Sequence, residues 1–406
     1  MYIKKRKGLP RKYKVVDLFC GCGGISRGLH MTGRFGTQFG VELERHPTSA
    51  FAANIKNVDN EPSHVFCGDI ELLSEDKTRL WKELRQGGIN QTGDIDLVTG
   101  GPPCQGFSRN GVRKYLDEER SQRFYDDPRN HLYKSFLTLI AELKPKVILI
   151  ENVREFLNFG HGKFTSDLLA RLDELGYYTE YKKLSAADFG VPQIRHRVFF
   201  LAARKKDVDK IGAHPSFPQP THSSKLNGHL NLFVESYRTV ADAIKDLPPP
   251  VDSHKAPPLE YPETNKVSDL AKLLRNPEGK IFNHVARKLS KTSLERIRAV
   301  GHKRMRDIDP ELRTQKFYGS AYGRLLWDAP ALTITTWVYH VGSGRFAHPE
   351  EDRAITMREA ARLQSFDDGF IFPPLINPVS QMIGNAVPPL LAKAFGEEIA
   401  KHLDSI

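Results

Sequence analysis

The stretch VVDLFCGCGG, residues 15–24, joins a short β-branched run to a loop that contains three glycines. Such a run is typical of a buried strand, and glycines directly after it let the backbone approach a ligand closely. We therefore expect a strand, a ligand-binding turn and a helix here, the opening unit of an α/β sheet.

Further strand-like runs follow at residues 38–41, 64–66, 95–98 and 147–150. Between them, residues 48–55 and 132–143 carry apolar side chains at intervals of three and four, the period of an amphipathic helix. This alternation predicts a doubly wound, mostly parallel sheet. Two later runs, 177–184 and 198–203, lie close enough in the sequence to pair antiparallel at the edge of that sheet.

The composition changes near Arg204. Residues 214–222 contain three prolines and residues 247–262 contain six, with little periodicity between them. A chain of 406 residues exceeds what one hydrophobic core usually organises, so two domains, or one domain with an insertion, are expected. We therefore predict three segments. Residues 1–203 form the first part of a catalytic domain, residues 204–348 form an inserted smaller region, and residues 349–406 return to the catalytic domain.

The returning segment carries two helix signals. Thr356 and Glu359 have the spacing of a capping box, which predicts a helix that continues through Leu363 and Phe366. The apolar residues between Val387 and Leu403 follow one helical face, which we expect to dock on the first domain.

The overall composition limits the class of protein. Hydrophobic residues make up 39% and charged residues 27%, as in ordinary globular proteins rather than disordered or membrane ones. The net charge of +11 favours a polyanionic partner, with nucleic acid first, although a generic positive surface is the alternative. Four cysteines and no secretory leader predict a reducing, intracellular compartment. No apolar run reaches the roughly 18 residues that span a bilayer.

The glycine loop predicts a nucleoside cofactor. Glu42 ends the second predicted strand, where its carboxylate can accept hydrogen bonds from ribose hydroxyls. The loop matches neither G-x-G-x-x-G nor the G-x-x-x-x-G-K-[ST] phosphate loop, so a nucleoside without phosphates is favoured. A plain tight turn is the alternative. Cys20 and Cys22 lack a second Cys/His pair at ligand spacing, so no metal is predicted.

Residues 100–108, GGPPCQGFS, place Cys104 just beyond the carboxyl end of a strand, where such sheets collect their ligand sites. A lone cysteine is more often an inert core residue, and only this placement favours a nucleophile. Glu151 ends the next strand at the same edge, although such a residue can also cap a helix. Arg195 and Arg197 occupy alternate positions and should point the same way; surface ion pairing is their alternative role.

Taken in this order, the segments resemble the DNA (cytosine-5) methyltransferase family at both ends of the chain. The matching segments are DLFCGCGG from Asp17, the acid Glu42, GDI from Gly68, PPCQ from Pro102, ENV from Glu151, QIRHR from Gln193, REAARLQSF from Arg358 and GNAVPP from Gly384.

The resemblance implies a methyltransferase fold of the S-adenosylmethionine-dependent type with an inserted target-recognition domain. It implies transfer of a methyl group to carbon 5 of cytosine, with Cys104 adding to carbon 6 and Glu151 bonding the exocyclic amine and N3. Arg197 would contact the base carbonyl, and Arg195 would fix the site or a phosphate. No side chain is evident for removing the carbon 5 proton, and water is the remaining base.

The same resemblance assigns the binding residues. S-adenosylmethionine would lie along Asp17, Phe19, Gly21, Gly23, Gly24, Glu42, Leu43, Asp69, Ile70 and Pro103, with Asn385 and Val387 closing its far side. Double-stranded DNA would meet Gln105, Ser108, Arg324, Thr335 and Thr336. The target cytosine must leave the stack, and residues 108–129 would form a lid over it.

The biological setting follows from the same family. A restriction–modification role is expected, with a cognate restriction endonuclease acting separately, a monomeric enzyme and a prokaryotic cytoplasm. Two alternatives stay open: a transfer RNA substrate, as in a related branch, and a catalytically silent DNA-binding protein. The long region before His348 favours DNA, and the presence of both Cys104 and Glu151 favours an enzyme.

Overall fold

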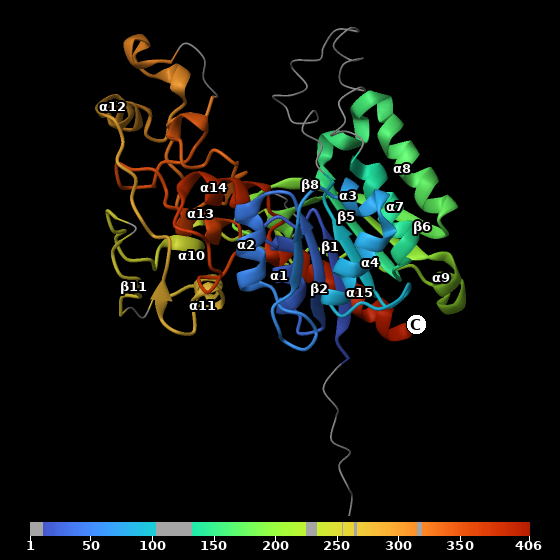
Figure 1. The fold of residues 1–406 in the computed structure, drawn as a ribbon. Coiled ribbons are helices and arrows are strands. Elements are labelled where there is room, and N and C mark those ends of the chain that lie inside the picture. Colours follow the sequence, from blue (N-terminus) through green and yellow to red (C-terminus); the bar gives the residue numbers. More distant parts are fainter. Residues whose placement is uncertain (1–10, 103–131, 225–233, 254, 264–265, 315–318) are drawn as a thin grey trace, which may run out of the picture.

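A seven-stranded sheet forms the body of the molecule (Figure 1). The computed structural model describes residues 11–102, 132–224, 234–253, 255–263, 266–314 and 319–406. The strands are β1 (Tyr13–Leu18), β2 (Phe35–Glu42), β3 (His64–Cys67), β4 (Leu97–Gly100), β5 (Val147–Val153), β6 (Tyr177–Ser185) and β8 (His196–Arg204). Their order across the sheet is β3-β2-β1-β4-β5-β8-β6.

The first five strands are parallel, and β8 runs antiparallel to both β5 and β6. This arrangement confirms the predicted doubly wound, mostly parallel sheet. It also confirms the antiparallel pair at the edge, where Tyr177 lies opposite Arg204 and Ser185 lies opposite His196.

Successive side chains of each strand enter different cores, because a strand alternates its two faces. Val15 packs with α1 (Gly24–Met31), α2 (Arg45–Asn54) and α15 (Pro389–Ser405). Its neighbour Val16 packs on the other side. The helices of that side are α3 (Glu71–Glu75), α4 (Lys77–Gln86), α7 (Leu132–Leu143) and α8 (Lys163–Glu174). Helices thus cover both faces, as the sequence pattern predicts.

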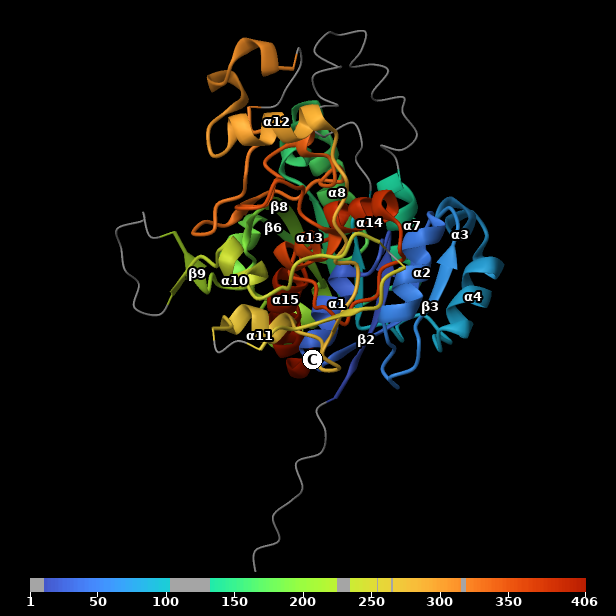
Figure 2. The ribbon, with the colours of Figure 1, turned by 90° about the vertical axis from the view of Figure 1, so that its left-hand side faces the viewer.

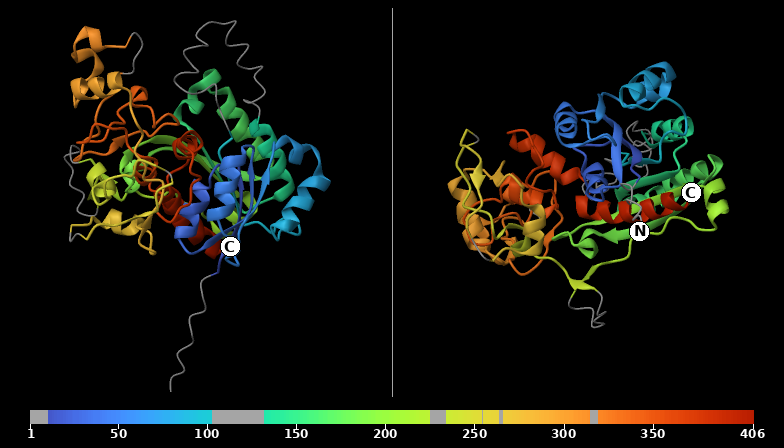
Figure 3. Two further views of the ribbon diagram at one scale, coloured as in Figure 1. Left: turned by 60° about the vertical axis from the view of Figure 1, so that its left-hand side comes forward. Right: turned by 90° about the horizontal axis from the view of Figure 1, so that it is seen from below.

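Helix α15 packs against the elements that begin the chain. Leu391, Phe395 and Ile399 are buried against the sheet, and α15 lies beside α1 (Figure 3). Gly28 of α1 permits this close packing, because a Cβ atom there would lie 2.2 Å from the Pro389 carbonyl oxygen.

In its described part, the region 204–348 contains short elements, and those that follow residue 212 gather beside the sheet (Figures 1 and 2). Its helices are α9 (Lys205–Ile211), α10 (Val240–Ile244), α11 (Asp269–Leu274) and α12 (Lys291–Val300), with single turns η5 (Met305–Asp307), η6 (Pro310–Leu312) and η7 (Val341–Ser343). Its two-residue strands are β9 (His222–Ser223), β10 (Glu235–Ser236), β11 (Leu259–Glu260), β12 (Lys280–Ile281) and β13 (Ala331–Leu332). Strand β13 pairs with β7 (Gln193–Ile194), which ties the end of this region to the sheet domain. The remaining elements are η3 (Arg154–Gly162), η4 (Ala186–Phe189), α13 (Met357–Leu363) and α14 (Ile376–Asn385).

Helix α13 begins as predicted and ends earlier than predicted. The Thr356 hydroxyl accepts the Glu359 amide, and the Glu359 carboxylate accepts the Thr356 amide, so the capping box is confirmed. The predicted continuation to Phe366 is wrong. Ser365 adopts a left-handed φ of 65°, which ends the helical path, and its hydroxyl accepts the Leu390 amide instead.

A buried charge cluster joins α13 to the region 204–348. The Arg362 guanidinium donates hydrogen bonds to two carboxylates, those of Asp368 and Asp246. Arg275 also donates to Asp246, and the Tyr261 hydroxyl donates to Asp368. Arg362, Asp246 and Asp368 are almost completely buried, so this network fixes the two parts of the chain together.

Among the described residues, no helix combines the length and the apolar character needed to cross a bilayer.

Candidate active site

The carboxyl ends of β1, β2, β4 and β5 meet at one edge of the sheet because these strands are parallel. The glycine loop follows β1 at this edge. Gly21 has a left-handed φ of 54°, and a Cβ atom there would meet no atom within 4 Å, so the loop faces open space. Gly23 is also left-handed and packs against Ile55 and Phe51. The loop therefore presents its backbone to a ligand while its far side is held by α2.

Glu42 holds this loop in place. Its Oε2 accepts the Gly21 amide at 3.0 Å, and its Oε1 accepts the Glu44 amide at 2.8 Å. Burial raises the pKa of Glu42, and the two backbone donors oppose that rise. Next to it, the Leu43 side chain is exposed. A carboxylate and an apolar side chain side by side suit the ribose and the ring of a nucleoside.

The predicted cofactor residues around the loop take different positions. Phe19 has a left-handed φ of 59° and is half-buried. At the end of β3, the Asp69 carboxylate accepts the Glu71 amide at 3.0 Å, and Ile70 is buried in the core. Asp69 is half-buried and remains at the rim of the loop edge.

Asp17 lies beneath the loop rather than on its open side. Its carboxylate accepts hydrogen bonds from the Ser26 hydroxyl at 2.6 Å and the Thr99 hydroxyl at 2.7 Å. Burial raises the pKa of Asp17 to about 6. Asp17 therefore connects the loop, α1 and β4, the strand that leads to Cys104. No sequence pattern predicts the roles of Ser26 and Thr99, since hydroxyl residues are common in helices and strands.

Glu151 and Arg197 form an ion pair at the end of β5. Arg197 Nε lies 2.8 Å from Glu151 Oε1, and both side chains are largely buried, with 16% and 12% exposed. The two residues come from adjacent antiparallel strands. A Cβ atom at Gly101 would lie 3.3 Å from Glu151 Oε2, so the carboxylate borders the segment that leads to Cys104.

The neighbour of Glu151 anchors that same segment. Asn152 Nδ2 donates to the Pro102 carbonyl at 3.2 Å. Pro103, Cys104, Gln105, Ser108 and the predicted lid 108–129 lie outside the described residues. The structure therefore places the acid and the start of the cysteine segment together, while the position of the sulfur stays a prediction.

Arg195 is completely buried, and its hydrogen-bond partners differ from those of Arg197. It donates to the Ile334 carbonyl at 3.1 Å and to the Gly384 carbonyl at 2.8 Å. Its Nε has no partner in the described part of the chain, and burial lowers the pKa of the guanidinium. Arg195 thus joins the end of the region 204–348 to α14, behind the site.

The segment 384–387 lies between the beginning of the chain and the end of the region 204–348. A Cβ atom at Gly24 would lie 2.4 Å from the Val387 carbonyl, and one at Gly384 would lie 2.3 Å from the Thr336 amide nitrogen. Asn385 is exposed and Val387 is buried. Three distant parts of the sequence therefore meet beside the glycine loop.

The predicted DNA contacts differ in how free their side chains are. Thr335 is exposed and Thr336 is half-buried. The Arg324 guanidinium donates to the carbonyls of His348 and Glu351 and pairs with Asp352. These internal partners hold Arg324 in place, and its contact with DNA stays a prediction.

Gln193 is a positioning residue that sequence reasoning treated only as part of a motif. Its Oε1 accepts the Ile334 amide at 2.8 Å, and its Nε2 donates to the Leu363 carbonyl at 3.1 Å. The side-chain amide of Gln193 thus joins two segments that are remote from it in the sequence. No local sequence pattern reveals such partners.

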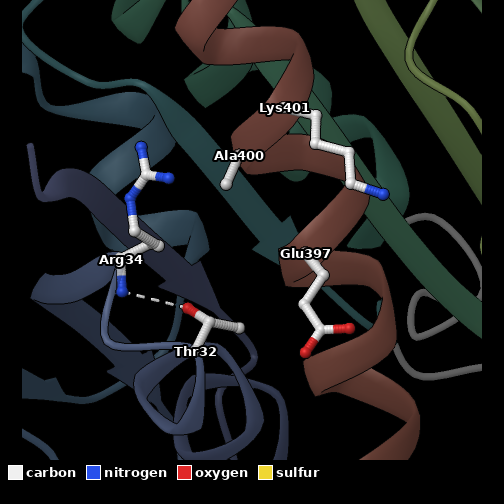
Figure 4. A pocket seen from close by; sticks show the side chains of 5 residues that line it. All are labelled: Thr32, Arg34, Glu397, Ala400 and Lys401. Atoms are coloured by element: carbon white, nitrogen blue, oxygen red, sulfur yellow. Dashed lines mark hydrogen bonds between the residues drawn. The ribbon is translucent and has the colours of Figure 1, made fainter. Parts of the chain in front are cut away.

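A shallow cavity of about 280 Å³ lies away from this edge (Figure 4). Thr32, Arg34, Glu397, Ala400 and Lys401 line it. Arg34 directly precedes β2 and pairs with Asp404, so this cavity belongs to the amino end of the strands. It therefore lies at the opposite edge of the sheet from Glu151. In the described part of the chain, no group of three or more His, Cys, Asp or Glu residues could hold a metal ion.

Comparisons with known proteins agree with this geometry. A family model described as C-5 cytosine-specific DNA methylase matches residues 13–401. The chain is 34% identical to Type II methyltransferase M1.HphI of Haemophilus parahaemolyticus, over 95% of this chain and 86% of that protein. It is 32% identical to Type II methyltransferase M.AgeI of Thalassovita gelatinovora, over 95% of this chain and 99% of that one.

A solved structure shares the fold. It is described as a prophage-encoded DNA modification methyltransferase of E. coli, with a TM-score of 0.69 and 25% identity, and the match covers 97% of this chain and 100% of that one. The seven-stranded sheet with its covering helices is thus the fold of the S-adenosylmethionine-dependent methyltransferases. The chain belongs to the C-5 cytosine-specific DNA methylases, enzymes that methylate carbon 5 of cytosine in DNA.

Proposed function

We propose that this chain methylates a cytosine extruded from a specific duplex DNA sequence, with Cys104 as nucleophile and Glu151 as the acid that assists it. The observation that carries the proposal is the Glu151–Arg197 pair at the end of β5. This pair borders Gly101, and Asn152 anchors Pro102, so the cysteine segment begins at the acid.

The residues at the glycine loop fit S-adenosylmethionine as methyl donor. The open side of Gly21 leaves room for the ligand, and Glu42 offers a carboxylate to its ribose hydroxyls. Leu43, Asp69 and Asn385, none of them buried, would contribute further contacts to this ligand. When bound there, S-adenosylmethionine supplies a methyl group on a positively charged sulfur.

The chemistry at the base follows from the reactivity of cytosine. Carbon 5 is a poor nucleophile, so the Cys104 thiolate first forms a bond to carbon 6, and the electron pair of the 5,6 double bond moves toward carbon 5. Glu151 donates a proton at N3 as negative charge builds in the ring. After methyl transfer, a base removes the proton from carbon 5, the freed electron pair re-forms the 5,6 double bond and expels the Cys104 thiolate from carbon 6, and N3 returns its proton to Glu151.

Arg197 serves the acid and the base together. Its Nε donates to Glu151, which fixes the orientation of the carboxylate. Its Nη1 donates to the His196 carbonyl at 2.8 Å, and the donors that are left suit the carbonyl oxygen of cytosine, where negative charge also develops. Arg195 acts behind them as a positioning residue through its bonds to Ile334 and Gly384.

A covalent trap tests this proposal. DNA that contains 5-fluorocytosine should form a denaturation-resistant adduct with the protein when S-adenosylmethionine is present, because fluorine cannot leave carbon 5 as a proton does. The Cys104→Ser variant should form none. Cys67→Ser is the matched control and should keep the adduct, since Cys67 is an exposed, free cysteine away from β4. An adduct that persists in Cys104→Ser refutes the assignment of the nucleophile.

The substrate and setting form the second part of the proposal. The region 204–348 would read duplex DNA, and relatives named type II methyltransferases support a restriction–modification role with a separate endonuclease. We expect a monomer that acts in the bacterial cytoplasm. Tritiated methyl transfer should be faster into duplex DNA than into transfer RNA, and mapping 5-methylcytosine in treated genomic DNA should return one short sequence.

A further inference from the structure

Several arginines near α12 have partners within the protein. Arg298 and Arg324 both pair with Asp352. Arg296 donates to the Leu312 carbonyl and Arg313 to the Ile308 carbonyl. These side chains are already engaged in holding the region 204–348 together.

Lys303, Arg304 and Arg345 are different. None of the three has a carboxylate within 4.0 Å among the described residues, the limit that defines the ion pairs found elsewhere in the chain. The nearest acid in sequence, Asp307, accepts the backbone amide of Arg304 and faces Arg306 Nε at 3.6 Å. Three neighbouring positive charges are therefore left without an opposite charge.

The fold holds the Arg345 guanidinium beside the other two residues. It donates to the Arg324 carbonyl at 2.9 Å and to the Lys303 carbonyl at 3.4 Å, which uses two of its five N–H groups. Gly323 makes the room, since a Cβ atom there would lie 3.3 Å from Arg345 Cζ. Burial and the positive charge of Arg304 both lower the pKa of Arg345. Like charges held together in this way repel one another until an anion joins them.

The backbone around the three cations is also anchored. The Arg324 amide donates to the Gly301 carbonyl at 2.9 Å, and the side chain of Met305, next to Arg304, is fully buried. Lys303 and Arg304 follow directly on α12, which Figures 1 and 2 show at the upper end of the molecule, and Arg345 reaches the Lys303 carbonyl from a later segment. The carboxyl ends of β1, β4 and β5 point toward that end.

We propose that Arg304 and Arg345, together with Lys303, bind a phosphodiester group of the DNA backbone. The inference rests on the proposed function, in which the region 204–348 meets DNA. Guanidinium groups match the geometry of phosphate oxygens through paired donors, and contacts of this kind fix the position of a protein on a duplex without reading its sequence. The site thus sets the register in which the neighbouring residues can reach the bases.

The salt dependence of DNA binding tests this site. Each phosphate that a protein neutralises adds about 0.9 to the slope of log Kd against log salt concentration. Arg304→Gln should weaken binding to the mapped target duplex and to a scrambled duplex by the same factor, roughly three- to tenfold, and should reduce that slope by about one. Arg304→Lys should restore the slope. Fluorescence anisotropy over a series of KCl concentrations measures both quantities.

Lys401→Gln is the matched control. It removes the same charge from an exposed side chain on α15, beside the cavity of Figure 4 and at the other edge of the sheet. It should leave affinity and slope unchanged. A slope for Arg304→Gln equal to that of the wild type overturns the phosphate site. If the wild type itself neither binds duplex DNA nor forms the 5-fluorocytosine adduct, the proposed function fails instead.

Discussion

Asp17 keeps a carboxylate inside the protein between two hydroxyl groups, and burial raises its pKa to about 6. The folded state therefore binds this proton more tightly than the unfolded state, in which an aspartate has a pKa near 3.9. The contribution of Asp17 to stability is fully present below the unfolded pKa. It is lost as the pH rises through the folded pKa.

The Asp17→Asn variant isolates the pH-dependent contribution of the Asp17 carboxyl group to the unfolding free energy. We expect the unfolding free energy of the wild type, relative to the variant, to fall by up to about 3 kcal/mol between pH 4 and pH 7 and then to level off. Urea denaturation at a series of pH values measures the difference. Parallel curves for the two proteins would show that Asp17 titrates normally.

Single residues also mark where sequence reasoning ends. The placement of Glu42 and Glu151 could be predicted because each lies near the carboxyl end of a strand, and the carboxyl ends of parallel strands share one edge; the role of Cys104 stays a prediction. The partners of Arg195 could not be predicted, because Ile334 and Gly384 are more than a hundred residues away in sequence. Arg195 and Arg197 lie close enough for their charges to interact, but Arg195 donates to the carbonyls of Ile334 and Gly384 whereas Arg197 pairs with Glu151.

At the scale of elements, the contact between α1 and α15 depends on Gly28. A methyl group there would lie 2.2 Å from the Pro389 oxygen and 2.6 Å from Ala392 Cβ, so the helices must separate to admit it. Gly28→Ala should lower the unfolding free energy by about 1–3 kcal/mol, the usual cost of overpacking. The midpoint of urea denaturation reports the change.

Gly319→Ala is the control for this substitution. Gly319 has no neighbour within 4 Å of the added atom, so its replacement should leave the midpoint almost unchanged. Equal shifts for both variants would mean that the packing of α1 on α15 is loose.

Elements were predictable where side-chain periodicity sets them. The helix over 132–143 and the five parallel strands follow from regular burial on fixed faces. The end of α13 was not predictable, because the left-handed turn at Ser365 is held by the distant Leu390 amide rather than by a local breaker. The short elements between residues 204 and 348 lack side-chain periodicity, so the sequence indicates this region only through a change in composition.

At the scale of the whole molecule, the charge cluster around Arg362 connects α13 with the region 204–348. Asp246 lies within this cluster and pairs with both Arg362 and Arg275. Asp246→Ala leaves two guanidiniums without that carboxylate. We expect the unfolding free energy to fall by about 3–5 kcal/mol, as it does when one partner of a buried ion pair is removed.

Asp269→Ala provides the comparison on the same part of the molecule. Asp269 is 92% exposed and pairs only with Lys272 at the surface, where ion pairs contribute less than about 1 kcal/mol. Chemical denaturation of both variants measures the loss of unfolding free energy for the buried and for the exposed ion pair. A loss for Asp246→Ala as small as that for Asp269→Ala would contradict a joining role for the cluster.

The packing of α15 on α1 has a consequence for synthesis on the ribosome. Phe395 of α15 lies against Phe199 of β8, so the part of this face that α1 and α2 do not cover stays exposed until α15 has been made. Helix α15 follows the whole region 204–348 in the chain. A nascent polypeptide therefore cannot complete its catalytic half first. Any chaperone that shields the exposed part of the sheet must stay bound while that entire region is translated.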